Sequence, residues 1–324
     1  MRRSAFRLPE TPDLTLTGTE LELKALDRLQ RYDVLPSNYV CAGMSRSNAQ
    51  NIRSRIIHAQ AVRIPEWARP WAIKRNVFYP LELTAIGEQV LRRHSRALPR
   101  HRGDDHFEHK YYRSTAEFLL DYGAELNGVG VEYLLDWLAD DRCPSATRAD
   151  KKAHHLPLPS GAFIVPDFSR TLTIPNASMN FHVENDRNTQ PLTSAADRQN
   201  IALKLRHYDE YLGSGGPERR YGRKSISILW LTTTEHRKDR MLQLFAKSQF
   251  PKRHAIQVLP DFTIGFPAPS DVLVSQPWER AEGGPLDILK TLRETAERKS
   301  HGPTRPSRPD RGTEQRDTRQ GSRA

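Results

Sequence analysis

The sequence is poor in cysteine and has no long apolar run. Cys41 and Cys143 are the two cysteines of the 324-residue chain, and they stand far apart without a CxxC pattern. This pattern excludes a disulfide framework and a structural zinc site of the usual spacing. No window approaches the roughly 20 apolar residues that cross a bilayer, and the first residues lack the apolar core of a signal peptide. We therefore expect a cytoplasmic protein that is neither exported nor integral to a membrane.

Acidic residues are outnumbered by basic ones. The chain has 50 Lys and Arg against 39 Asp and Glu, which gives a formal net charge of +11, and its pI is about 9.8. Basic side chains neutralise phosphates and release condensed counterions, so we expect double-stranded DNA as a partner. The alternative is a basic soluble protein without a nucleic-acid partner, because part of the charge lies in the C-terminal tail.

Short helical patterns followed by strand patterns occupy the first part of the chain. After a polar leader, residues 1–16, leucines repeat at helical spacing in ELELKALDRLQRYD. Two further short helices are expected over YVCAGM and RSNAQNIRSRIIHA, two strands over VRIPEWARPWAIKRNVFYPLEL, and a last helix over LTAIGEQVLRR. This order predicts a winged helix-turn-helix domain over residues 17–95, and residues 96–112 are expected to be a linker.

The third of these helices is rich in side chains that hydrogen-bond base edges or phosphates. The DNA-binding residues expected here are Arg46, Asn48, Gln50, Asn51, Arg53 and Arg55, with Lys74 and Arg75 on the wing. An ordinary solvated helix face, or a winged helix that contacts protein, is the alternative interpretation.

An α/β pattern follows over residues 113–285. A helix is expected from Ser114 to Leu126, and strands are expected over EYLLDWLA, GAFIVPDF, MNFHVEN, SISILWLTT and AIQVLPDF, with helices before and after SISILWLTT. The predicted order is β-β-β-α-β-α-β in a mixed sheet, so the fold class is α/β, or α+β for the whole chain. Residues 286–324 are expected to form one helix and then a disordered basic tail.

Two acids and a lysine stand at strand and helix positions of this second part. Asp167 lies in the VPDF end of the expected strand GAFIVPDF, Glu184 lies in FHVENDR, and Lys204 lies in the helix IALKLRHYDEYL. Carboxylates on neighbouring strands can hold Mg²⁺ or Mn²⁺, and a lysine can stabilise phosphoryl charge. The alternative is that Asp167 closes a turn, that Glu184 pairs with Arg187, and that Lys204 is a surface residue.

These motifs also resemble a known family. PDF, FHVENDRNT, KLRHYDEY and SISILWLTT, in this order after YPLELTAIGE and FEHKYYRSTAEF, are similar to the core of the bacterial replication-relaxation family of plasmids, phages and integrative elements. The resemblance implies a restriction-endonuclease-like domain, as in the related MobC-type mobilisation relaxases with their Asp, Glu and Lys triad. It implies Asp167 and Glu184 as metal ligands and Lys204 as the third catalytic residue.

One position departs from the commonest endonuclease-like pattern, in which the lysine stands two residues after the second acid. Asp186 occupies that position, so Lys204 would have to act from the following helix. Two functions therefore remain open: a metal-dependent DNA-nicking or relaxase-like enzyme in replication or mobilisation, and a non-catalytic DNA-binding regulator with a vestigial site. A homodimer, or replication and mobilisation proteins, are the further partners expected.

Overall fold

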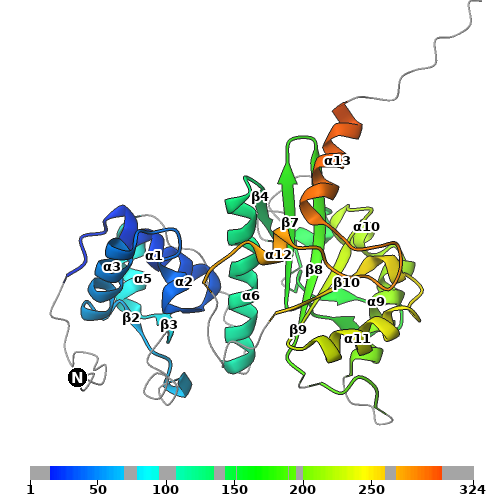
Figure 1. Ribbon diagram of the computed structural model, residues 1–324, viewed down its shortest axis with the longest axis horizontal. Helices are drawn as coiled ribbons and strands as arrows, with labels where there is room; N and C mark the ends of the chain where they lie inside the picture. Colours follow the sequence, from blue (N-terminus) through cyan, green and yellow to red (C-terminus); the bar gives the residue numbers. More distant parts are fainter. Residues whose placement is uncertain are drawn as a thin grey trace, which may run out of the picture.

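The computed structural model describes residues 15–68, 79–94, 107–134, 143–150, 152–188, 190–194, 200–259 and 268–300. The fold is mixed α/β, and its largest sheet is mixed (Figure 1). Among the helices in these ranges, none is both long enough and apolar enough to cross a membrane.

The N-terminal elements form a helical group with a small antiparallel sheet. They are α1 (Glu20–Tyr32), β1 (Val34–Pro36), α2 (Ser37–Val40), α3 (Arg46–His58), β2 (Val62–Arg63), a 3-10 turn (Glu66–Ala68), β3 (Pro80–Leu83) and α5 (Ala85–Arg93). The sheet order is β1-β3-β2. A capping box between Thr19 and Glu22 starts α1, and the Ser45 hydroxyl caps α3, because these side chains satisfy amide groups that the first helical turn leaves unpaired.

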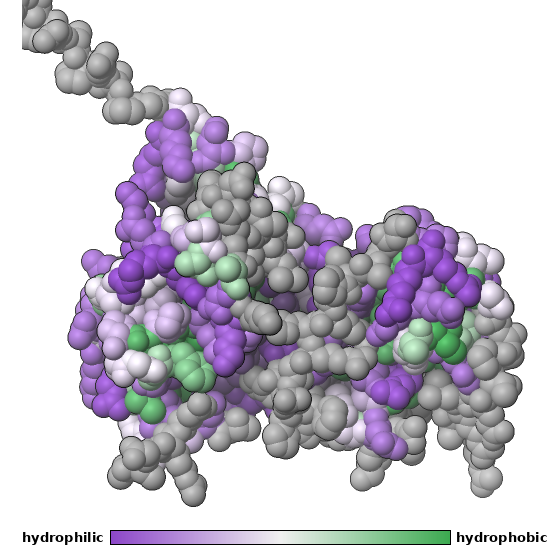
Figure 2. All heavy atoms as spheres, turned by 180° about the vertical axis from the view of Figure 1, so that it is seen from behind, coloured by the Kyte–Doolittle hydropathy of each residue, from purple (hydrophilic) through white to green (hydrophobic). Residues whose placement is uncertain are grey.

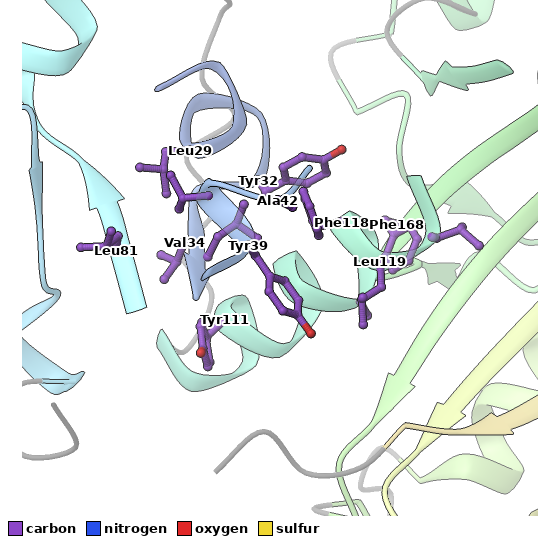
Figure 3. Packing of buried hydrophobic residues seen from close by; sticks show 14 of the residues in the cluster. Leu29, Tyr32, Val34, Tyr39, Ala42, Leu81, Tyr111, Phe118, Leu119 and Phe168 are labelled. Atoms are coloured by element: carbon purple, nitrogen blue, oxygen red, sulfur yellow. The ribbon is translucent and has the colours of Figure 1, made fainter. Parts of the chain in front are cut away.

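Helix α6 (Phe107–Leu126) joins the two parts of the molecule. It begins before Ser114, so the expected helix start is wrong and the last residues of the expected linker are helical. Figure 3 shows Tyr32 and Tyr39 beside Phe118 of α6, with Phe168 of the large sheet beyond. The Phe118 ring centroid lies 5.4 Å from that of Tyr32 and 5.3 Å from that of Tyr39. One hydrophobic core therefore runs from the N-terminal elements through α6 to the sheet.

A buried ion-pair network reinforces this junction. The Arg170 Nε atom donates to Asp121 Oδ1 of α6 at 2.9 Å, and the same guanidinium donates to Glu117. The Tyr32 hydroxyl donates to the other Asp121 oxygen at 2.9 Å. Asp121 thus connects α1, α6 and the sheet through a single carboxylate.

The second part contains a five-stranded sheet and a separate two-stranded hairpin. Its elements are β4 (Gly130–Tyr133), α8 (Ser145–Arg148), β5 (Leu156–Pro157), β6 (Phe163–Ile164), β7 (Phe168–Ile174), β8 (Ala177–Asp186), α9 (Ile201–Gly213), α10 (Gly216–Tyr221), β9 (Ser227–Thr232), α11 (Glu235–Phe245), a 3-10 turn (Pro251–Arg253), β10 (His254–Val258), α12 (Val272–Ser275) and α13 (Ile288–Ser300). The five-stranded order is β10-β9-β8-β7-β4. Pairing is antiparallel from β4 to β8 and parallel from β8 to β10.

The strand order of the large sheet along the chain agrees with the expected β-β-β-α-β-α-β, but its first two strands are displaced. The strand expected over EYLLDWLA is observed earlier, as β4, and residues 135–142 lie outside the described residues. Within GAFIVPDF, Phe163 and Ile164 form β6, which pairs with β5 instead of joining the sheet. Pro166 has no amide hydrogen for a ladder, and the sheet strand β7 begins after it, at Phe168.

Side chains alternate between the two faces of the sheet. Leu229 and Leu231 of β9 belong to the core shared with α6, α12 and α13, whereas Ile228 and Trp230 belong to a second core with α9 and α11. Hydrophilic side chains dominate the described surface in Figure 2, and the apolar areas there are limited in extent. The tail expected after α13, residues 301–324, lies outside the described residues.

Candidate active site

Asp167 and Glu184 are brought together by the antiparallel pairing of β7 and β8. The Asp167 amide donates to the Val183 carbonyl at 3.1 Å, one residue before Glu184. The Asn185 amide donates to Asp167 Oδ2 at 2.6 Å, one residue after it. Asp167 therefore lies directly beside Glu184, although 17 positions separate them in the chain. Phe181 and Val183 point into the opposite core, as period-2 alternation predicts.

Helix α9 supplies two side chains to the same carboxylate. The Asn200 side chain caps this helix by accepting from the Leu203 amide at 2.8 Å. One turn later, the Lys204 ammonium donates to Glu184 Oε2, and the Tyr208 hydroxyl donates to Glu184 Oε1. Residues four apart share a helix face, so α9 presents both donors to β8 at once. Tyr208 is at the same time fully buried in the core, so it both packs and binds.

Burial controls the electrostatics of this group. It raises the pKa of Glu184 to about 7, although the neighbouring Lys204 lowers it. Burial disfavours the charged form of Lys204, yet the carboxylates of Glu184 and Asp167 outweigh this and raise the pKa of its ammonium. The Lys204 side chain is 26% exposed and that of Glu184 only 2%, so the lysine is the member that reaches toward solvent.

A pocket of about 320 Å³ opens over these three residues. Its other polar lining residues include Arg113, Asn185, Asp186, Gln190, Asn200 and His207. The pocket has room for a phosphate group, and it combines two carboxylates with one ammonium. This composition suits the binding of a cation and a phosphate together.

Asp186, which stands where the commonest pattern has a lysine, makes its ion pair with Arg237, whereas Lys204 makes its ion pair with Glu184. The Asp186 Oδ2 atom accepts from Arg237 Nε at 2.7 Å, and the same guanidinium donates to the Gln190 carbonyl at 2.5 Å. The expected alternative for Glu184, a pair with Arg187, is not what the structure has. The Arg187 guanidinium lies 3.7 Å from the ring centre of Tyr112, and Glu184 pairs with Lys204.

The metal-ligating capacity of the site rests on two carboxylates. Within the described residues, no group of three or more His, Cys, Asp and Glu side chains is placed to hold a metal ion. Asp167 and Glu184 are the residues that would hold Mg²⁺ or Mn²⁺, because such ions often bind one or two carboxylates and take their remaining ligands from water and substrate phosphates.

The expected DNA-binding residues of α3 fall into two groups. Arg46, Asn48, Gln50 and Asn51 are exposed, and Arg53 is half-buried. Arg55 instead donates from Nε to the buried Glu22 Oε1 at 2.6 Å, so it supports the packing of α3 against α1. Lys74 and Arg75 of the expected wing lie outside the described residues.

A groove of about 960 Å³ runs along one side of α3. Arg46, Gln50 and Arg53 line it at helical spacing, and Tyr122 of α6 and Pro269 also contribute to its lining. The sequence contained no signal for this arrangement, because Tyr122 and Pro269 are far from α3 in the chain.

Comparison with known proteins identifies no relative. No protein-family model matches the chain, no curated protein matches it, and no solved structure matches it.

Proposed function

We propose that this protein binds double-stranded DNA and cleaves one strand with a divalent metal ion, as a replication-relaxation-like protein of a bacterial mobile element. The observation that carries the proposal is the convergence of Asp167, Glu184 and Lys204 in one pocket. Asp167 from the segment before β7, Glu184 from β8 and Lys204 from α9 meet there. Two carboxylates beside an ammonium are suited to phosphodiester chemistry.

The N-terminal elements support the DNA-binding half of the proposal. Three helices and a three-stranded antiparallel sheet follow one another here in the order α1-β1-α2-α3-β2-β3. We infer a winged helix-turn-helix from this order. In helix-turn-helix proteins the second helix of the motif enters the major groove. In this proposal that helix would be α3, whose exposed Arg46, Asn48, Gln50 and Asn51 have the hydrogen-bonding groups for base edges and phosphates.

The sheet and its pocket support the chemical half. Asp167 and Glu184 would hold Mg²⁺ or Mn²⁺, which would supply Lewis-acid stabilisation of phosphoryl charge and an activated water. The Lys204 ammonium would stabilise negative charge on the phosphate oxygens. The Tyr208 hydroxyl orients Glu184 from the side opposite to Lys204.

A second candidate function is a regulator that binds DNA without cutting it. The observation that favours it is that both carboxylate oxygens of Glu184 already accept hydrogen bonds from protein side chains. Asp186 at the usual lysine position favours it as well. In that case Lys204 and Glu184 would be a structural pair, and the mobile element would use the protein in replication or transcription control.

Nicking of supercoiled plasmid separates these two functions. The plasmid should carry the DNA that neighbours the protein's own gene, and the reaction should contain Mg²⁺ or Mn²⁺. We expect Glu184→Gln and Lys204→Ala to lower nicking at least about 100-fold while duplex binding is retained. Lys247→Ala is the matched control, because Lys247 is exposed at the end of α11. Tight binding by the wild type without nicking in either metal would establish the regulator.

A further inference from the structure

A small apolar ledge borders the mouth of the pocket. Four large apolar side chains are exposed within the described residues: Ile86, Leu126, Phe163 and Val165. Two of them, Phe163 and Val165, line the pocket that holds Asp167, Glu184 and Lys204. Single exposed apolar residues are normal on protein surfaces, but two together beside a charged site call for a ligand with an apolar face.

The local backbone explains why these two side chains face outward together. Phe163 and Ile164 form β6, which pairs with β5 in the hairpin before Asp167. Successive strand residues point to opposite sides, so Ile164 is buried in the second core while Phe163 and Val165 share the outer side. Only four chain positions separate Phe163 from Asp167, so the ledge and the acidic pair are continuous.

Phe163 is also held in a defined orientation. Its ring stacks on the His155 imidazole with centroids 4.8 Å apart and an interplanar angle of 17°. His154 in turn meets His155 edge-on, with centroids 4.4 Å apart and an interplanar angle of 85°. Phe163 nevertheless remains 57% exposed. A flat aromatic surface that is supported from one side and open to solvent is a stacking platform.

We propose that Phe163, supported by His155, stacks on a nucleobase of the strand whose phosphate enters the pocket. This inference rests on the proposed function, since it takes the pocket to hold a phosphate. A base within a duplex is stacked on its neighbours and paired, so it cannot offer a face to Phe163. The base that stacks on Phe163 is therefore unpaired, and the strand at the pocket is locally single-stranded. Aromatic side chains serve unpaired bases in this way with little dependence on sequence.

The test compares binding of a fluorescently labelled single-stranded oligonucleotide with binding of the same sequence as a duplex, both without divalent metal so that no cleavage occurs. Phe163→Ala should weaken single-strand binding by about 5-fold or more and leave duplex binding unchanged. Leu126→Ala is the matched control, because Leu126 is 56% exposed but lies at the end of α6, away from the pocket. That control should leave both affinities at the wild-type level.

A second variant keeps the aromatic surface. Phe163→Trp should bind the single strand with the affinity of the wild type. The fluorescence of the introduced tryptophan, obtained as the difference between the variant and the wild type, should be quenched by the single strand and not by the duplex. The proposal would be overturned if wild type and Phe163→Ala bound the single strand equally well, or if the single strand did not quench the fluorescence of Phe163→Trp. The ledge would then be a contact surface for another protein.

The two proposals fail separately in these experiments. If the wild type does not nick plasmid but Phe163→Ala loses single-strand binding, the stacking site stands and cleavage falls. If the wild type nicks plasmid and Phe163→Ala binds the single strand normally, cleavage stands and the stacking site falls.

Discussion

The polar side chains of α3 and the charged side chains of the sheet pocket are held in different ways. Arg46, Asn48, Gln50 and Asn51 point into solvent, so their geometry is set by one helix alone. Glu184 and Lys204 meet because β8 and α9 pack together, and burial raises the pKa of Glu184 to about 7. An exposed charge contributes little to stability and is available to a partner, whereas a buried one destabilises the fold unless it is paired.

The largest effect in this comparison is expected at Arg170. Arg170→Met leaves Asp121 and Glu117 without their cation at the junction of α6 and the sheet. Breaking a buried pair by removing one partner costs about 3–5 kcal/mol, so urea unfolding should show a loss of this size. Arg63→Met is the control, since the Arg63 side chain is 65% exposed in its pair with Glu82, and it should cost under about 1 kcal/mol. If both variants lost the same free energy of unfolding, burial would not determine how much these ion pairs contribute to stability.

Two arginines of α3 sharpen the comparison within one helix. Arg55→Ala removes the side-chain donor to the fully buried Glu22 and should cost about 1.5–3 kcal/mol of stability, with the salt dependence of DNA binding unchanged. Arg53→Ala, two positions away, should leave stability unchanged and lower the slope of log affinity against log salt by about 1. The free energy of unfolding and the salt dependence of DNA binding should be measured for both variants. A smaller salt slope for Arg55→Ala than for the wild type would show that Arg55 contacts the DNA.

His182 offers a test through pH. Burial lowers the pKa of His182 from its ordinary value of about 6.5 to about 3. The imidazole is therefore neutral in the fold and accepts a proton more readily when the chain is unfolded. Stability is therefore lost as pH falls below about 6.5, and His182 alone should account for about 2 kcal/mol between pH 7 and pH 5. When the free energy of unfolding is measured in urea at pH 7 and pH 5, the difference between the two pH values should be about 2 kcal/mol smaller for His182→Asn than for the wild type. If stability changes between the two pH values as much in His182→Asn as in the wild type, the pKa of His182 is the same in the folded and the unfolded chain.

The smallest effect is expected at Tyr208. Its hydroxyl donates to the charged form of Glu184, so Tyr208→Phe should raise the pKa of Glu184 by about one unit. The carboxyl ¹³C titration of Glu184 without divalent metal measures this shift directly. Tyr211→Phe is the control, because Tyr211 lies on the same buried helix face, where its hydroxyl has no hydrogen-bond partner among the described residues. The same shift in both variants would indicate a packing effect.

Local patterns in the sequence were enough to predict most of the helices and the order of the sheet strands along the chain. Leucine spacing in α1, the serine cap of α3 and the alternation along β8 all act over a few residues, so they were predictable. The first two sheet strands were misplaced because strand propensity does not reveal which segment finds a partner. Of the neighbouring strands β6 and β7, β7 pairs with β8, whereas β6 pairs with β5.

The sequence by itself determined the charge balance, the exposed polar face of α3 and the three candidate residues of the pocket. Only the tertiary structure decided that Tyr208 shares Glu184 with Lys204, that Asp186 belongs to Arg237, and that Arg55 belongs to Glu22. The reason is that each of these contacts joins residues from different elements. Their pairing depends on how the elements pack, and on which charges burial forces to find a partner.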